Sequence, residues 1–156
     1  MSEDIPSKHS DSVVIIPMYN ECENASAIID AVISLEHDFD ILVIDDNSPD
    51  GTAAIVKKKM EQYPGRVHII ERKGKLGLGT AYITGFKWSV DHGYDFIFEM
   101  DADFSHNPAD LMKLYHATAV EGADVAIGSR YVTGVNVVNW PMGRVLMSYY
   151  ASKYVR

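Results

Sequence analysis

The sequence contains a single cysteine, Cys22, among 156 residues. An internal disulfide needs two cysteines, so a disulfide framework is excluded, and no cysteine-rich zinc site can be built. The sequence also lacks an apolar run of about 18 residues, the length that a membrane-spanning helix requires. Residues 1–11 are polar and lack the apolar segment of a secretion signal, so we interpret them as a flexible N-terminal tail.

Acidic residues are absent after Asp124, although Arg130, Arg144, Lys153 and Arg156 follow. The whole chain has a net charge of −8, which argues against general nucleic-acid binding because the phosphate backbone would meet a repulsive surface. The basic C-terminal part suits an anionic partner. A short basic helix whose charges merely keep it in solution is the alternative that the charge pattern leaves open.

Short apolar runs alternate with amphipathic stretches, a pattern typical of βαβ units and of a parallel sheet covered on both faces. With a hydrophobic content of 47%, we expect one α/β domain over residues 12–156. The expected strands are Ser12–Pro17, Phe39–Ile44, Val67–Glu71, Tyr94–Met100 and Ala123–Gly128. The expected helices are Glu23–Leu35, Thr52–Tyr63, Thr80–His92 and Ala109–Glu121. Ligands of such sheets bind at the carboxyl ends of the strands.

Paired carboxylates follow two of these strands. Asp45 and Asp46 follow the second, and Asp101 and Asp103 follow the fourth. Neighbouring like charges are costly unless a cation or a hydrogen-bonding ligand compensates them. The spacing Asp101-Ala102-Asp103 suits two oxygen ligands beside Mg²⁺ or Mn²⁺, with substrate phosphates completing the shell. Turn aspartates also produce this pattern, and its place after a buried strand is what favours a metal.

Other ion- and phosphate-binding patterns are incomplete. Residues 46–51 begin like a calcium loop, but Lys57 stands where a bidentate glutamate is needed. The glycine-rich stretch Gly74–Gly79 lacks the Gly-Lys-Ser/Thr ending of a phosphate-binding loop. Tyr82 replaces the last glycine of a dinucleotide fingerprint, so we interpret the stretch as a loop that leads into a helix.

Several segments together resemble the family 2 glycosyltransferases. They are Pro17-Met18-Tyr19-Asn20-Glu21, Asp45–Thr52, Leu76–Ala81, Asp101-Ala102-Asp103 and Gly128-Ser129-Arg130-Tyr131. Within that family, Ser105-His106-Asn107-Pro108 and Asn139-Trp140-Pro141 with Arg144 narrow the resemblance to the polyprenol-phosphate (dolichol-phosphate) mannose synthases. The segments occur in the same order from about Val13 onward, which makes the combination far more specific than any one of them.

The resemblance implies a GT-A fold, which is Rossmann-like, and transfer of mannose from GDP-mannose to the phosphate of a polyprenyl phosphate, with inversion at the sugar carbon. It also assigns roles to individual residues. Nucleotide binding would involve Pro17, Tyr19, Glu21, Ile44, Asp46, Asp101 and Ala102. The metal would lie on Asp101 and Asp103, and the catalytic residues would be Asp103, Arg130 and Arg144. Arginine is a bidentate phosphate partner, which fits either the acceptor or the donor phosphates.

A phosphate acceptor simplifies the chemistry. A phosphate monoester is already anionic near neutral pH, so it attacks the anomeric carbon without a strong protein base. We therefore expect Asp103 to matter more for the metal and the diphosphate than as a base. The C-terminal part mixes apolar and aromatic side chains with cations, which suits peripheral contact with the cytoplasmic face of a membrane, although an ordinary core helix fits the same spacing.

The family continues beyond the point where this sequence stops, so we expect the chain to be a C-terminally incomplete catalytic domain. Two alternatives stay open at this stage. One is a family 2 enzyme that uses a UDP-sugar on a lipid phosphate or a saccharide hydroxyl, because a carboxylate such as Asp46 accepts hydrogen bonds from guanine or uracil. The other is a phosphoacceptor signalling module, which also gathers aspartates around a metal at strand ends but needs a lysine where this chain has Arg130.

Overall fold

The structure is a computed structural model that describes residues 9–129 and 141–154. Its strands are β1 (Ser12–Met18), β2 (Asp40–Asp45), β3 (Val67–Glu71) and β4 (Phe96–Glu99). Its helices are α1 (Ala25–Ile33), α2 (Thr52–Gln62), α3 (Leu78–Asp91), α4 (Asp110–Tyr115), the π-helical turn η1 (His116–Val120) and α5 (Met142–Tyr154). Within the expected domain of residues 12–156, the chain divides into two compact units. The boundary between them in the sequence lies between Asp124 and Val125.

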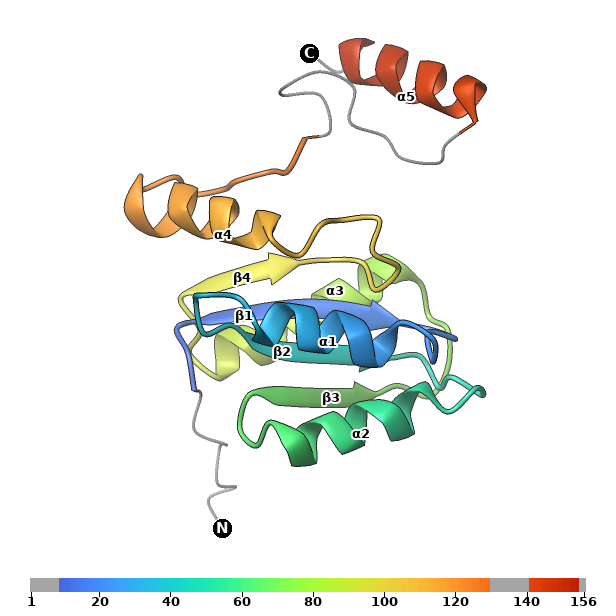
Figure 1. Cartoon of the computed structure of the whole chain (residues 1–156), viewed down its shortest axis with the longest axis vertical. Coiled ribbons are helices and arrows are strands. Elements are labelled where there is room, and N and C mark those ends of the chain that lie inside the picture. Colours follow the sequence, from blue (N-terminus) through green and yellow to red (C-terminus); the bar gives the residue numbers. More distant parts are fainter. Residues whose placement is uncertain (1–8, 130–140, 155–156) are drawn as a thin grey trace. The chain divides into compact units, whose positions relative to one another are not determined.

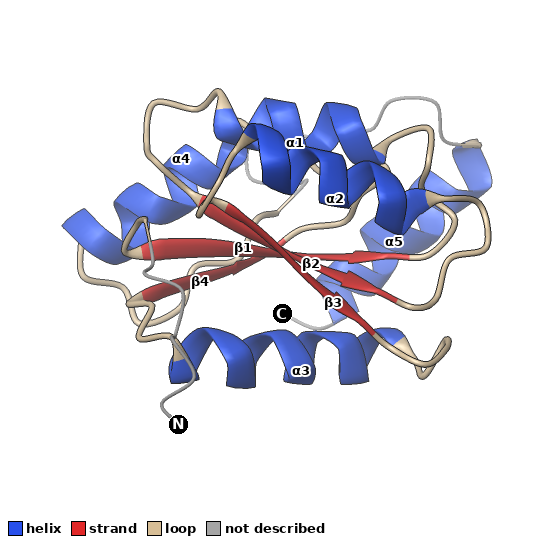
Figure 2. Ribbon diagram, turned by 90° about the horizontal axis from the view of Figure 1, so that it is seen from below, coloured by secondary structure: helices blue, strands red, loops and turns tan. Residues whose placement is uncertain are grey.

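In the first unit, the described strands form a parallel four-stranded sheet in the order β3-β2-β1-β4. Helices α1, α2 and α4 cover one face of the sheet and α3 covers the other (Figures 1 and 2). The expected Rossmann-like α/β architecture, with a parallel sheet between helical layers, is therefore confirmed. In Figure 1 the strands point to the right, so their carboxyl ends and the loops that follow them lie on that side.

The central strands β1 and β2 are mainly apolar because both of their faces are buried. Side chains alternate between the faces, as strand geometry requires. Val14 and Val43 belong to the core cluster on the side of α1 and α2. Ile15 and Leu42 pack with Ala81 of α3 in a second cluster. All six residues of β2 are buried, which agrees with its place inside the sheet.

The start of α2 follows the local sequence closely. Oδ1 of Asp50 accepts hydrogen bonds from the backbone N–H of Thr52, at 3.0 Å, and from its hydroxyl, at 2.6 Å. Gly51 lies between them with φ of 90°, a conformation that glycine adopts without steric cost. The Asp50 carboxylate thus satisfies a backbone N–H in the first turn of α2.

After β4, the expected helix is present with a local change in its winding, whereas the expected strand is wrong. The helix expected over Ala109–Glu121 changes at His116 into the π-helical turn η1, where the hydroxyl of Thr118 bonds to the carbonyls of Leu114 and Tyr115. The segment Ala123–Gly128 contains no strand. Its apolar side chains Val125 and Ile127 are 75% and 84% exposed, so no neighbouring strand buries them in the part of the chain that the structure describes.

The described part of the second unit is dominated by α5. The carbonyl of Pro141 accepts the backbone N–H groups of Arg144 and Val145 and thereby starts the helix. Met142, Leu146, Met147 and Tyr150 are large apolar or aromatic side chains of α5 that are exposed. None of the described helices combines the length and the apolar character that crossing a bilayer requires.

Candidate nucleotide site

Two loops at the carboxyl ends of β1 and β2 are joined by hydrogen bonds from backbone to side chain. The N–H of Asn20 donates to Oγ of Ser48, and the N–H of Glu21 donates to Oγ1 of Thr52, both at 3.0 Å. The N–H of Cys22 donates to Oδ2 of Asp50 at 3.0 Å. The segment after β2 therefore holds the segment after β1 in place.

The polar residues after β2 mostly serve this loop structure. Asp45 is 1% exposed and accepts hydrogen bonds from the N–H and the hydroxyl of Ser48, at 3.0 and 2.6 Å. A hydrogen bond from the hydroxyl of Thr52 is the main cause that holds the pKa of Asp50 below its ordinary value. The carboxylates of Asp45 and Asp50 therefore accept hydrogen bonds from the protein itself, which accounts for their spacing without a bound ion.

A pocket opens at this edge of the sheet, between the loop after β1 and the start of α3. It is lined by Pro17, Met18, Tyr19, Glu21, Asp46, Lys75, Leu78 and Ala81. The structure thus brings together Pro17, Tyr19, Glu21 and Asp46, which the sequence predicts as nucleotide-binding residues. They come from two neighbouring strand ends, as the strand-end rule for ligand sites requires.

Charged and aromatic groups face each other across the pocket. The ammonium of Lys75 lies 4.7 Å from the centre of the Tyr19 ring, a cation–π distance. Asp46 is 7% exposed and forms an ion pair with Arg72, whose side chain is equally buried. The carboxylate of Glu21 accepts a hydrogen bond from Asn24 at 2.9 Å, while its carbonyl caps α1. The pocket therefore offers both signs of charge and an aromatic face.

The Asp-Ala-Asp segment follows β4 at the same edge of the sheet. The hydroxyl of Tyr82, next to the pocket residue Ala81, donates to Oδ1 of Asp101 at 3.3 Å. Ala102 is 3% exposed and packs into the core, which turns its two neighbours toward the surface. Oδ1 of Asp103 accepts the N–H of Ser105 at 2.9 Å. Asp101, Ala102 and Asp103 do not line the pocket itself.

The electrostatics around Asp101 and Asp103 suit a divalent cation. Hydrogen bonding from Ser105 is the main cause that lowers the pKa of Asp103, so this carboxylate is ionised near neutral pH. Burial, together with the charge of Asp101, raises the pKa of Glu99 at the end of β4. A cation would relieve this concentration of negative charge. No cluster of three or more His, Cys, Asp or Glu ligands occurs in the described ranges, so other oxygen donors would have to complete the shell.

The remaining predicted site residues are Ile44, Arg130 and Arg144. Ile44 is fully buried in the cluster beneath α3 and does not line the pocket. Arg130 lies outside the described residues. Arg144 is exposed on α5 in the second unit, and its predicted role in binding a phosphate stays a prediction.

Sequence reasoning missed Arg72, Lys75 and Tyr82. Arg72 is the residue directly after β3, so the strand-end rule that singled out the aspartates applies to it equally. Lys75 lies in the stretch that the sequence identifies only as a loop. Tyr82 occupies the position at which the dinucleotide pattern fails, and its phenol reaches Asp101 instead.

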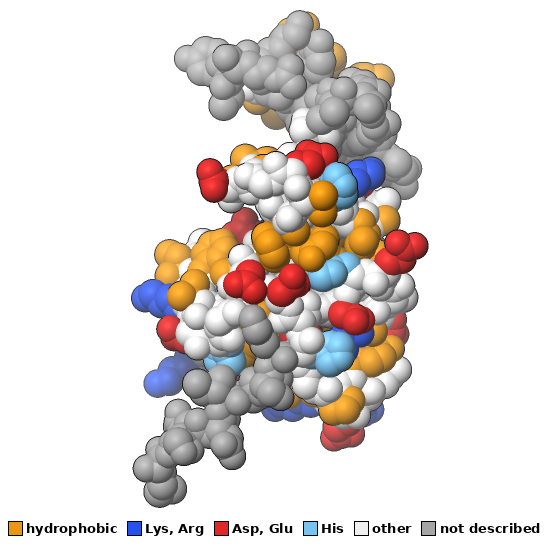
Figure 3. Space-filling view, turned by 90° about the vertical axis from the view of Figure 1, so that its left-hand side faces the viewer, with side chains coloured by type: hydrophobic (Ala, Val, Ile, Leu, Met, Phe, Trp, Pro, Cys, Tyr) orange, Lys and Arg blue, Asp and Glu red, His pale blue; other side chains and the backbone are white. Residues whose placement is uncertain are grey.

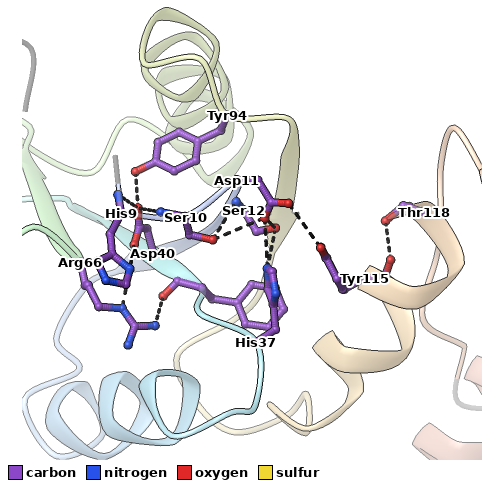
Figure 4. Close-up of polar contacts among 11 residues, drawn as sticks. His9, Ser10, Asp11, Ser12, His37, Asp40, Arg66, Tyr94, Tyr115 and Thr118 are labelled. Atoms are coloured by element: carbon purple, nitrogen blue, oxygen red, sulfur yellow. Dashed lines mark hydrogen bonds and ion pairs between the residues drawn. The ribbon is translucent and has the colours of Figure 1, made fainter. Parts of the chain in front are cut away.

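A second polar cluster occupies the opposite edge of the sheet, where the strands begin. Acidic and histidine side chains gather on this face in Figure 3, and Figure 4 shows the contacts among some of them. Nε2 of His37 lies 3.0 Å from Oγ of Ser12 and 3.1 Å from Oδ1 of Asp11. A Ser-His-Asp relay uses both ring nitrogens and an accessible serine, whereas here one nitrogen makes both contacts and Ser12 is fully buried. These contacts therefore connect His37 to the start of β1 and do not form a catalytic relay.

Comparisons with known proteins place these features in a family. A family model described as glycosyl transferase family 2 matches residues 13–155. The chain is 48% identical over 145 residues to the polyprenol monophosphomannose synthase of Mycolicibacterium smegmatis, a match that covers 93% of this chain and 54% of that protein. It is 44% identical over 144 residues to the undecaprenyl-phosphate mannosyltransferase of Micrococcus luteus, covering 92% of this chain and 58% of that one.

A third relative is the dolichol-phosphate mannosyltransferase of Pyrococcus furiosus. It is 41% identical over 137 residues, which cover 86% of this chain and 37% of that protein. The chain therefore spans about half the length of the first two curated relatives that it matches, and less of the third.

Proposed function

This chain belongs to glycosyl transferase family 2, and we propose that it transfers mannose from GDP-mannose to the phosphate of a polyprenyl phosphate. The names of its relatives support the sugar and the class of acceptor, since all three act on a polyprenol-type phosphate and transfer mannose. Family membership sets aside the phosphoacceptor signalling module, whose sequence pattern already failed at Arg130.

The observation that carries the proposal is the pocket at the ends of β1 and β2. Four side chains that the resemblance assigns to the nucleotide, Pro17, Tyr19, Glu21 and Asp46, line this one pocket. The Asp101 carboxylate is connected to it through Tyr82, the neighbour of the pocket residue Ala81. A nucleoside bound in the pocket would thus have its diphosphate directed toward the acidic segment after β4.

Asp101 and Asp103 would hold a divalent cation, Mg²⁺ or Mn²⁺. Their carboxylates are the hard oxygen donors that such ions prefer, and the depressed pKa of Asp103 keeps one of them charged. When bound, the cation would neutralise charge on the diphosphate leaving group. The protein residues would orient the donor and hold the two carboxylates in place through Tyr82 and Ser105.

The transfer itself needs no strong protein base. An oxygen of the acceptor phosphate forms the new bond to the anomeric carbon, the bond to the β-phosphate oxygen breaks, and GDP leaves with the electron pair. Catalysis then depends on positioning and on stabilisation of the phosphate charges. We assign Arg130 and Arg144 to the acceptor or donor phosphates, because arginine binds such groups in a bidentate manner.

A lipid-linked acceptor implies contact with a membrane surface, which we propose to be peripheral and on the cytoplasmic side. The exposed Met142, Leu146, Met147 and Tyr150 of α5 accompany the cation Arg144 on a helix without acidic residues. This combination of apolar side chains and positive charge favours an interfacial segment that attracts anionic lipids.

The proposal is tested by thermal unfolding of the protein with Mn²⁺ or Mg²⁺ and with GDP, UDP or acetyl phosphate. We expect GDP with metal to raise the unfolding temperature more than UDP, and acetyl phosphate to have no effect. A larger shift with UDP would favour the UDP-sugar alternative. The absence of any nucleotide effect on the folded protein would refute the transferase proposal. Transfer of labelled mannose from GDP-mannose to a short-chain polyprenyl phosphate then tests the reaction directly.

A further inference from the structure

Arg72 donates hydrogen bonds from two of its nitrogens to the carboxylate of Asp46. Nε bonds to Oδ1, and one terminal nitrogen donates to Oδ2 at 2.7 Å. The two side chains are 7% and 10% exposed, so the pair is largely withdrawn from water. A planar guanidinium that contacts both oxygens fixes the plane of the carboxylate, which a lysine ammonium does not do.

The same guanidinium also reaches the glycine-rich loop and the first turn of α3. The terminal nitrogen of Arg72 that does not contact Asp46 donates to Oγ1 of Thr80 at 2.7 Å. The terminal nitrogen that bonds to Asp46 also donates to the carbonyl of Gly77 at 3.3 Å. The hydroxyl of Thr80 also lies 2.7 Å from that carbonyl. One side chain therefore connects the end of β2 to the loop between β3 and α3.

That loop forms one wall of the nucleotide pocket. Lys75 and Leu78 line the pocket opposite the residues of the β1 loop, and Lys75 lies over the ring of Tyr19. The other wall includes Asp46. Arg72 does not line the pocket, yet it contacts residues that belong to both walls or adjoin them.

We infer that Arg72 is a positioning residue of the nucleotide site, which orients the Asp46 carboxylate and holds residues 73–77 against the pocket. The inference rests on the proposed function, since it concerns the same site. Each Asp46 oxygen keeps a lone pair beyond the one that Arg72 uses. These remaining lone pairs point away from each other, so the fixed carboxylate can present one oxygen to an N–H of the base. Arg72 would therefore contribute to nucleotide affinity without touching the base.

The experiment measures dissociation constants for GDP and UDP in the presence of Mn²⁺, for the unmodified protein and for Arg72→Lys and Arg72→Gln. We expect both variants to bind GDP about tenfold more weakly, the effect of losing a bidentate charge-assisted contact. Hydrogen exchange of residues 73–79 should become faster in both variants, because the tether from Arg72 to the loop is lost or weakened.

Arg66 is the matched control. It is the residue directly before β3, whereas Arg72 is the residue directly after β3. Its side chain is 15% exposed, one terminal nitrogen donates to the carbonyl of Phe39 at 2.8 Å, and its Nε lies 4.0 Å from Oδ1 of Asp40. Arg66→Gln thus removes a similarly buried arginine from the opposite edge of the sheet. We expect it to lower the unfolding temperature while leaving GDP affinity unchanged.

The possible outcomes separate this inference from the function on which it rests. If the unmodified protein binds neither nucleotide, the proposed function fails and the inference fails with it. If the unmodified protein binds GDP and both Arg72 variants match it in GDP affinity and in loop exchange, the positioning role alone is overturned. An equal loss of GDP affinity in Arg66→Gln would also overturn it, since the effect would then be general destabilisation. If Arg72→Gln does not fold, the GDP affinity and the loop exchange of Arg72→Lys test the inference.

Discussion

The hydroxyl of Tyr82 donates to Oδ1 of Asp101 across 3.3 Å and so connects α3 to the loop after β4. Burial, together with the charge of Asp101, raises the pKa of Tyr82, which keeps the phenol protonated as a donor throughout the physiological pH range. This contact relates the pocket to the proposed metal ligands. Its removal should therefore affect metal-dependent binding more than the fold.

We expect Tyr82→Phe to weaken Mn²⁺-dependent GDP binding by about fivefold, because a hydrogen bond of this kind contributes roughly 1 kcal/mol. Isothermal titration with and without Mn²⁺ measures the effect. Tyr63→Phe is the control, since the Tyr63 hydroxyl also donates to a carboxylate, that of Asp30, away from the pocket. Equal affinities for Tyr82→Phe and the unmodified protein would show that the contact does not orient Asp101.

Gly85 marks the closest approach of α3 to β1. A Cβ added there would lie 2.7 Å from Cγ2 and 2.8 Å from Cδ1 of the buried Ile15. We expect Gly85→Ala to lower the free energy of unfolding by about 1–3 kcal/mol, the typical cost of overpacking. Gly79→Ala on the same helix meets nothing within 4 Å and should raise stability by up to about 1 kcal/mol. Urea denaturation of both variants tests this contrast, which fails if both alanines have the same effect.

Asp30 gives the fold a defined acid sensitivity. Partial burial acts to raise its pKa, but hydrogen bonds from Lys59 and Tyr63 outweigh this and hold the pKa below its ordinary value. A carboxyl whose pKa is lower in the folded state stabilises the fold above its unfolded pKa of about 3.9, and loses that contribution as pH falls through the folded pKa. We expect Asp30→Asn to be less stable than the unmodified protein at neutral pH and to approach it in stability as the pH falls through the lowered pKa of Asp30.

Unfolding midpoints between neutral and acidic pH measure this difference. Asp110→Asn is the control, because Asp110 and Lys113 form an exposed pair on α4 that should contribute little. A stability gap between the unmodified protein and Asp30→Asn that does not change with pH would contradict the assignment.

Asp40 is fully buried at the start of β2 and depends on surrounding donors (Figure 4). Its Oδ2 accepts hydrogen bonds from the hydroxyl of Tyr94, at 2.8 Å, and from the backbone N–H groups of His9 and Ser10. We expect Tyr94→Phe to cost about 1.5–3 kcal/mol of unfolding free energy, the usual value of a hydrogen bond to a charged group. Chemical denaturation measures this cost, and GDP binding should stay unchanged because Tyr94 lies at the opposite edge from the pocket. A loss below about 0.5 kcal/mol would mean that other donors replace the phenol.

Much of the fold was predictable because its signals are local and repeated. β3 was predicted to the residue, and β1 and β2 to within one residue at each end. Ala123–Gly128 has the composition of a buried strand, yet composition does not supply the neighbour that a strand needs, and Val125 and Ile127 are exposed. Whether such a segment pairs depends on contacts distant in the sequence.

The site was predictable in its acidic residues and less so in the groups that hold them. Asp46 lines the pocket as expected, whereas its neighbour Asp45 serves the loop through Ser48, a difference that two adjacent aspartates do not reveal in sequence. Arg72 lies 26 residues from Asp46, and only the parallel pairing of β2 with β3 brings the two together. Side chains that act through another residue have no pattern of their own.

The two arginines that flank β3 also bear on how the protein folds. Arg66 and Arg72 meet the aspartates at the two ends of β2, and a slip of β3 by one residue would turn both guanidinium groups to the opposite face of the sheet. A misaligned intermediate would then bury Asp46 without its counter-charge, which is costly. The wall of the pocket that contains Lys75 is therefore completed only when β3 pairs with β2 in its native alignment, so the binding site reports on the register of an edge strand.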